Sequence, residues 1–176
     1  MIKKGPASTH RIRSTPFTSR VEAAGVTSYT AYNHMLLPTV FESLEADYEH
    51  LVKYVQLWDV SCQRQVELRG PDAARLVQLL TPRDLRKTVS LQGKYAPLCD
   101  HDGRLINDPV VLRVNEDTVW FSIADSDVLL WIRAISGERG DDVEVSEPDV
   151  SPLAVQGPSA TDTVADVFGA WIRELK

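Results

Sequence analysis

The side chain best placed to do chemistry in this sequence is the carboxylate of Asp108. It follows residues 105–107 (LIN) and precedes Pro109, so its charge would lie beside apolar surface. A charge in such a place costs free energy unless a polar group hydrogen-bonds or pairs with it. Such a carboxylate can orient a nitrogen by a charge-assisted hydrogen bond or stabilise positive charge that develops on it. Asp108 could instead be a solvated residue of a hairpin, and residue type alone leaves both interpretations open.

Other kinds of catalytic or metal site lack the residues that they need. The two cysteines, Cys62 and Cys99, form no CxxC pair, and the four histidines do not have metal-ligand spacing. We therefore expect no zinc or iron site, and two isolated thiols suit a reducing cytoplasm. The sequence also lacks a glycine-rich phosphate loop and a GxSxG motif, which argues against nucleotide and serine hydrolysis.

Composition indicates a globular protein with a real core. The 176 residues are 43% hydrophobic and 25% charged, and the net charge of −6 argues against nucleic acid as a partner. Residues 1–20 are basic and contain no Asp or Glu, as in an organelle transit peptide. They have no apolar helical stripe and are interrupted by Pro6 and Pro16, so we interpret them as an extended arm on the surface. No apolar run is long enough to cross a membrane, so we expect no membrane partner.

The elements that must position Asp108 are short strands joined by polar turns. Residues 94–109 read as a hairpin, with Asp100, Asp102 and Gly103 in its turn. Further strands are expected at 110–114, 118–123 and 143–145, and a helix from about 125 to 135 that Gly137 would end. Short turns between strands and interspersed helices predict an α+β fold, with antiparallel sheets and flanking helices.

A longer helix is predicted to begin at Thr39. Thr39 and Glu42 have the spacing of a capping box, and the helix should run to about Leu57. Its apolar positions fall on one helical face, which we expect to be core. These positions are Phe41, Leu44, Tyr48, Leu51 and Val55.

Two segments repeat a strand, the pattern G-P-x-A, and a helix. The pattern occupies residues 70–73 and 157–160, where glycine allows a sharp turn and proline suits the start of a helix. The similarity hints at an internal duplication. Near the end of the chain, Trp171, Ile172 and Leu175 need a surface to pack against. They could belong to a terminal helix docked on the core, or the chain could be half of a larger fold.

Seven short motifs, in order along the chain, carry a resemblance to a known family. The sequence resembles the folate-dependent aminomethyltransferase family of the glycine cleavage T-protein, and within it the dimethylsulfoniopropionate demethylase branch. This resemblance makes the N-terminal arm part of the mature protein. The motifs are residues 32–38 (YNHMLLP), 58–61 (WDVS), 64–67 (RQVE), 80–85 (LTPRDL), 106–109 (INDP), 123–127 (IADSD) and 155–158 (VQGP).

The resemblance implies the first half of a three-domain cloverleaf around a central tetrahydrofolate pocket. Residues 1–63 would be the first segment of a discontinuous folate-binding domain 1, and residues 64–149 would be the inserted domain 2. Residues 150–176 would be an incomplete return segment of domain 1. The resemblance therefore also implies a partner, a second subunit that carries the C-terminal half of the fold; a truncated chain is the alternative.

The resemblance also assigns roles to individual residues. Asp108 matches the family's essential carboxylate beside the folate, and Asn107 replaces a carboxylate of typical T-proteins, which favours the demethylase branch. The expected cofactor-binding residues are Gln63, Tyr95, Asp108, Ser122, Ile123 and Ala124, although many T-proteins have Met where this chain has Gln63. Tyr32 and Met35 would lie on the substrate side, or would simply pack in the core.

The function implied is a cytoplasmic, tetrahydrofolate-dependent demethylase that acts on a small methylated donor. Two alternatives stay open. The first is an aminomethyltransferase of the glycine-cleavage type, which Asn107 disfavours. The second is a folate-binding module without catalytic activity, which the retained Asp108 and Tyr95 disfavour.

Overall fold

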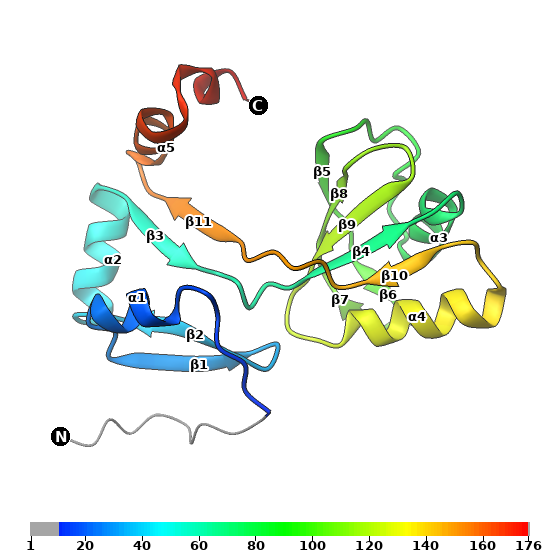
Figure 1. The fold of residues 1–176 in the computed structure, drawn as a ribbon, viewed down its shortest axis with the longest axis horizontal. Coiled ribbons are helices and arrows are strands. Elements are labelled where there is room, and N and C mark those ends of the chain that lie inside the picture. Colours follow the sequence, from blue (N-terminus) through cyan, green and yellow to red (C-terminus); the bar gives the residue numbers. More distant parts are fainter. Residues whose placement is uncertain (1–10, 176) are drawn as a thin grey trace. The chain divides into compact units, whose positions relative to one another are not determined.

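A computed structural model describes residues 11–175, and the chain divides into two compact units. Unit 1 comprises residues 1–62 and 151–176, and unit 2 comprises residues 63–150. Helices and antiparallel sheets occur together, so the predicted α+β class is confirmed (Figure 1). The helices are α1 (Thr18–Ala23), α2 (Leu44–Lys53), α3 (Ala73–Leu80), α4 (Val128–Arg139), α5 (Ala160–Phe168) and the 3-10 helix η1 (Ala170–Glu174). The strands are β1 (Ser28–Tyr32), β2 (Met35–Val40), β3 (Gln56–Asp59), β4 (Gln65–Arg69), β5 (Gln92–Tyr95), β6 (Leu98–Cys99), β7 (Leu105–Asn107), β8 (Val110–Arg113), β9 (Thr118–Ser122), β10 (Glu144–Ser146) and β11 (Leu153–Gln156).

Unit 2 is built on a five-stranded antiparallel sheet in the order β10-β4-β9-β8-β5. Side chains alternate between its faces. Val66, Val111 and Phe121 are cross-strand neighbours on one face and are buried in the main hydrophobic core. Helices α3 and α4 contribute Leu76 and Ile132 to the same core. The residues that alternate with these in sequence, such as Gln65 and Ser122, therefore lie on the opposite face of the sheet.

The hairpin predicted for residues 94–109 divides between two sheets. Tyr95 ends β5, which pairs with β8 in the large sheet, whereas β6 and β7 form a small sheet of their own. The turn of this small hairpin is held by Asp100, whose Oδ1 accepts the backbone N–H groups of Asp102 and Arg104 at 2.9 and 2.8 Å. Asp108 follows β7 directly, between the two sheets.

Unit 1 contains two pairs of antiparallel strands, β1–β2 and β3–β11. Asn33 and His34 have φ values of 48° and 62°, and they form a two-residue turn of the type that matches strand twist. Asn33 is tolerated in this backbone conformation, and its side chain donates to the carbonyl of Cys62 at 2.9 Å. The turn makes Tyr32 and Met35 direct cross-strand partners.

The prediction of a helix from Thr39 to Leu57 is wrong at both ends. Thr39 lies in β2, and α2 begins only at Leu44, where the Ser43 hydroxyl accepts the N–H of Ala46 at 3.1 Å. The apolar stripe is not core either: no α2 residue is buried within this chain, and Leu44 is 69% exposed.

Two other boundaries differ from the prediction. Helix α4 continues through Gly137 and ends at Arg139, and Gly140 follows it with a φ of 65°, the left-handed conformation that commonly closes a helix. The predicted N-terminal arm contains the short helix α1 from Thr18, and its residues 1–10 lie outside the described part of the chain.

Candidate functional site

Asp108 and Tyr95, which the sequence analysis selected separately, lie in hydrogen-bond contact. Tyr95 Oη donates to Asp108 Oδ2 at 3.0 Å. The backbone brings them together, because Ala96 N donates to Pro109 O at 3.0 Å. Donation to the Asp108 carboxylate raises the pKa of the Tyr95 phenol, and burial and the negative charge of Asp108 act in the same direction. Asp108 is half-buried and Tyr95 is 52% exposed, so this pair faces outward with its polar groups already oriented.

Asn107 has a structural role that its sequence position did not reveal. Its side chain is 4% exposed and bonds both backbone groups of Ala124: Nδ2 donates to the carbonyl and Oδ1 accepts the N–H, each at 3.0 Å. Nδ2 also donates to Ser126 Oγ at 2.7 Å, and this hydroxyl donates to Ile106 O at 3.0 Å. The amide thus fixes the end of β7, from which Asp108 projects, against residues 124–126.

Two of the predicted residues, Tyr95 and Ser122, lie in one cross-strand row of the sheet. Tyr95 pairs with Val110, Val110 with Ser122, and Ser122 with Gln65. Directly opposed residues share a face, and the neighbouring row of Val111 and Phe121 faces the core. The row containing Tyr95 and Ser122 therefore lies on the face opposite the core.

Gln65 was not among the predicted site residues, although it links two of them. Its Nε2 donates to Gln63 O at 2.8 Å and to Ser122 Oγ at 3.0 Å. The signal in the sequence was its alternation with the apolar residues Val66 and Leu68 in residues 65–69, which places it on the opposite face of the strand. Gln63 itself is exposed, and it is its backbone carbonyl that accepts from Gln65.

Ile123 and Ala124 were predicted to bind the cofactor, but most of their backbone N–H and C=O groups already make hydrogen bonds within the protein. The Ile123 side chain is buried in the core, and its N–H donates to Arg64 O at 3.0 Å. Both backbone groups of Ala124 are bonded to Asn107. The Ala124 carbonyl also accepts the N–H of Ser126 at 2.9 Å, so both of its lone pairs are already used.

Tyr32 and Met35 belong to unit 1, and the other predicted residues belong to unit 2. Met35 is buried and Tyr32 is half-buried. The binding roles of all the predicted site residues stay predictions.

The donor set on unit 2 suits a polar, planar ligand rather than a metal ion. Within residues 11–175, no group of three or more His, Cys, Asp or Glu side chains could hold a metal. In the same range no helix is long and apolar enough to span a bilayer. A half-buried carboxylate accepts hydrogen bonds from N–H groups, and the exposed ring of Tyr95 offers an aromatic face beside it.

Comparison with known proteins relates most of the chain to one family. The model of the GCVT N-terminal domain matches residues 17–174. Dimethylsulfoniopropionate demethylase DmdA of Ruegeria pomeroyi is 54% identical over 94% of this chain and 46% of its own length. A probable aminomethyltransferase of Halobacterium salinarum is 30% identical over 93% of this chain and 47% of its own length.

A solved structure shares the fold. Glycine cleavage system aminomethyltransferase T from Bartonella henselae matches with a TM-score of 0.76 and 21% identity, over 88% of this chain and 43% of that one. The chain thus spans about half the length of the curated relatives and of the solved structure that it matches.

Proposed function

The chain belongs to the GCVT N-terminal domain family, and from this premise we propose that it is part of a tetrahydrofolate-dependent demethylase. The observation that carries the proposal is the 54% identity, over 94% of the chain, to a protein named as a dimethylsulfoniopropionate demethylase. The 30% identity to an aminomethyltransferase gives that alternative less support. The proposed substrate class is a small methyl donor of the sulfonium or quaternary ammonium type.

The residues of unit 2 fit the proposed cofactor by their chemistry. Asp108 accepts hydrogen bonds from N–H groups, and Tyr95 holds one oxygen of its carboxylate at 3.0 Å. Asp108, Tyr95 and the Ser122 row would bind the pterin ring system, with Gln63 at its margin. Tetrahydrofolate, when bound, supplies the nitrogen that accepts the methyl group.

The proposed role of Asp108 is electrostatic. Methyl transfer places positive charge on the accepting nitrogen, and a nearby carboxylate that is already oriented stabilises this charge without reorganising. The hydrogen bond from Tyr95, and the bonds of the Asn107 side chain to the backbone of Ala124, restrict where the carboxylate can lie. Tyr32 is a candidate for cation–π contact with the methyl donor.

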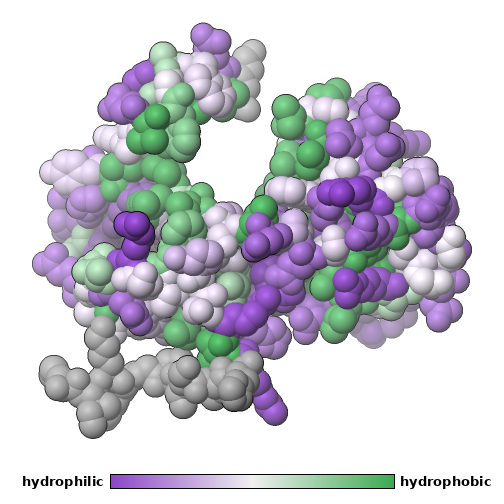
Figure 2. Space-filling model, viewed as in Figure 1, coloured by the Kyte–Doolittle hydropathy of each residue, from purple (hydrophilic) through white to green (hydrophobic). Residues whose placement is uncertain are grey.

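We also propose that a second polypeptide supplies the remaining half of the fold. The argument rests on unit 1, which exposes large apolar side chains over β3, β11 and α5 (Figure 2). Such patches mark interaction surfaces. They include Leu57, Leu153, Val167 and Phe168. Co-purification with a polypeptide that resembles the second half of the relatives would support this; an active, stable monomer would contradict it.

The test of function uses the partner-complete protein and Asp108→Asn. We expect this variant to lose about 100-fold in methyltetrahydrofolate formation, because the amide keeps the shape of the side chain but removes its charge. The assay uses dimethylsulfoniopropionate and glycine betaine as donors. Asp102→Asn, in the exposed turn of the neighbouring hairpin, is the matched control and should keep wild-type turnover.

Three outcomes separate the readings. Wild-type turnover in Asp108→Asn would show that the electrostatic role is wrong. Folate binding without turnover of any donor would favour a binding module. Aminomethyl transfer from a lipoyl carrier protein would favour the glycine-cleavage type.

A further inference from the structure

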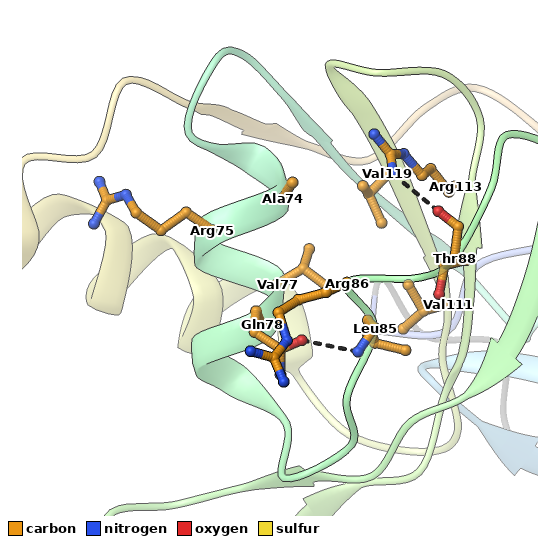
Figure 3. Close-up of a pocket in the computed structure, with 10 residues that line it drawn as sticks. All are labelled: Ala74, Arg75, Val77, Gln78, Leu85, Arg86, Thr88, Val111, Arg113 and Val119. Atoms are coloured by element: carbon orange, nitrogen blue, oxygen red, sulfur yellow. Dashed lines mark hydrogen bonds between the residues drawn. The ribbon is translucent and has the colours of Figure 1, made fainter.

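Unit 2 contains a pocket that involves none of the residues assigned to the proposed folate site. It has a volume of about 420 Å³ and lies between α3, the loop that follows α3, and strands β8 and β9 (Figure 3). Pockets that hold small molecules begin at about 300 Å³ and combine apolar walls with a few polar groups. The question is whether this pocket has both.

The walls are apolar and belong to the rigid part of the unit. Val77 from α3, Leu85 from the loop, and Val111 and Val119 from the sheet are all buried and line the cavity. The same side chains are members of the main core, so their positions are fixed by packing. This surface fits a compact, branched apolar group.

Two polar residues, Thr88 and Arg113, line the cavity, and within residues 11–175 neither is bonded to an acidic side chain. Thr88 is only 6% exposed, and within residues 11–175 its hydroxyl has no hydrogen-bond partner. Arg113 is half-buried; its Nη1 donates to Thr88 O at 2.9 Å and its Nε to Asn115 O at 3.3 Å. Across the described part of the chain, no carboxylate pairs with Arg113, so its positive charge is uncompensated beside an apolar cavity.

The other two arginines of the lining are already paired. Arg86 binds Asp84 through Nε and Nη2 at 2.9 and 2.8 Å, and Arg75 binds Asp141 at 2.6 Å. The pocket therefore presents one unbalanced positive charge. A ligand with a single negative charge balances it, whereas a doubly charged phosphate would leave excess negative charge in a partly desolvated place.

The loop that closes the pocket is held on both sides. From α3, Gln78 accepts the Leu85 N–H at 2.8 Å and donates to Arg83 O at 2.9 Å. From β8, the carbonyl of Arg113 accepts the N–H of Leu91 at 2.6 Å. The cavity is thus preformed, so a ligand would not have to order the loop when it binds.

We propose that this pocket binds a small monocarboxylic acid with a branched apolar body. The body lies on Val77, Leu85, Val111 and Val119, and the carboxylate receives hydrogen bonds from the Thr88 hydroxyl and the Arg113 guanidinium. The site is separate from the folate site, so it holds whether or not the proposed function is correct.

The experiment titrates the full, methyl-labelled chain with 3-methylbutanoate and, separately, with its neutral isostere 3-methylbutanamide, followed by NMR. We expect saturable shifts of the Val77, Val111 and Val119 methyl signals with the acid, and binding at least about tenfold weaker with the amide, because the charge-assisted bonds are lost. Equal binding of acid and amide, or no saturable shift at these methyls, overturns the proposal.

Two variants locate the binding. Thr88→Val removes the hydroxyl at nearly constant volume and should weaken binding of the acid several-fold; Ala74→Phe should fill the pocket and abolish it. Leu79→Phe places the same ring on the same helix outside the lining and should bind like wild type. Unchanged binding in both Thr88→Val and Ala74→Phe, or methyl shifts that depend on protein concentration alone, would show that another surface or a second copy is responsible.

Discussion

At the scale of single residues, two neighbouring side chains have opposite environments. Asn107 is buried and bonded to the backbone of Ala124, whereas Asp108 is half-buried and bonded to the phenol of Tyr95. An amide suits position 107 because it must donate and accept at once, which a carboxylate cannot do. The two neighbours therefore have different roles: Asn107 positions the backbone, and Asp108 is the one that a ligand can reach.

The Tyr95–Asp108 contact predicts a change in titration. The carboxylate raises the pKa of Tyr95, so Asp108→Asn should let this tyrosine ionise at lower pH than in the wild type. A raised tyrosine pKa stabilises the folded state fully below the unfolded value near 10, and this contribution is lost as pH rises through the folded pKa. Absorbance of tyrosinate during alkaline titration checks this, with Tyr95→Phe to assign the signal. An unchanged curve in Asp108→Asn would contradict the contact.

Asn107→Asp should destabilise unit 2 by about 2 kcal/mol, because a buried carboxylate would face the Ala124 carbonyl without a donor. The loss should shrink at acidic pH, where the carboxyl regains a proton. Urea denaturation at two pH values measures it. Asn115→Asp is the matched control, since the exposed Asn115 side chain accepts the N–H of Asp117 through Oδ1 at 2.9 Å, and a carboxylate retains this bond. Equal stability of both variants would show that the bonds between Asn107 and Ala124 do not stabilise unit 2.

At the scale of elements, both copies of G-P-x-A turn at a glycine that no other residue can replace. Gly70 and Gly157 have φ values of 147° and 124°, and a Cβ on either would collide with a backbone carbonyl, of Asp142 and of Tyr54 respectively. The prolines precede their helices: α3 begins at Ala73 and α5 at Ala160. The pattern was thus interpreted correctly as a sharp turn, but its proline is not the first helical residue.

Gly70→Ala should destabilise the chain by about 2–4 kcal/mol, because it adds a collision to a backbone conformation that a side chain disfavours. Gly137→Ala is the opposite control: Gly137 is exposed inside α4 with open space around it, so alanine should stabilise by up to about 1 kcal/mol. Urea midpoints measure both. A neutral Gly70→Ala would show that the backbone can shift at this turn.

The error in predicting α2 has a different cause, which is strand pairing. The capping box at Thr39 is a correct pattern, but residues 35–40 pair with β1, and the N–H of Thr27 donates to Val40 O at 2.8 Å. The N–H groups of Phe41 and Glu42 then donate to Asp47 rather than into a helical turn. Sheet pairing, which depends on distant residues, overrode the local signal.

At the scale of the whole molecule, the core is distributed unequally. The main cluster, from Val66 to Val145, lies entirely in unit 2, whereas few hydrophobic side chains of unit 1 are buried within the chain. An ion pair between Arg64 and Glu147 joins the two ends of unit 2. Unit 2 therefore has the properties of an independent folding unit.

Residues 63–150 expressed alone should fold and unfold cooperatively, because their core is contiguous and their ends are paired. A dispersed amide spectrum and a single urea transition would support this expectation. Arg64→Met in the fragment should lower its stability, since Glu147 would lose its half-buried partner. A fragment with native helix content but no dispersed signals would contradict independent folding.

The sequence by itself determined the α+β class, the turn glycines and the family, because alternation, positive φ and ordered motifs are local or linear properties. It also singled out Asp108 and Tyr95, but it could not predict their hydrogen bond, since Tyr95 lies on β5 and Asp108 beyond β7. Only the tertiary structure decided that the Asn107 side chain bonds the backbone of Ala124 and that Gln65 links Gln63 to Ser122. It also decided that the apolar residues of α2 are not buried within this chain. Each of these depends on which distant strands pair, and pairing is a property of the packed sheet rather than of any single segment.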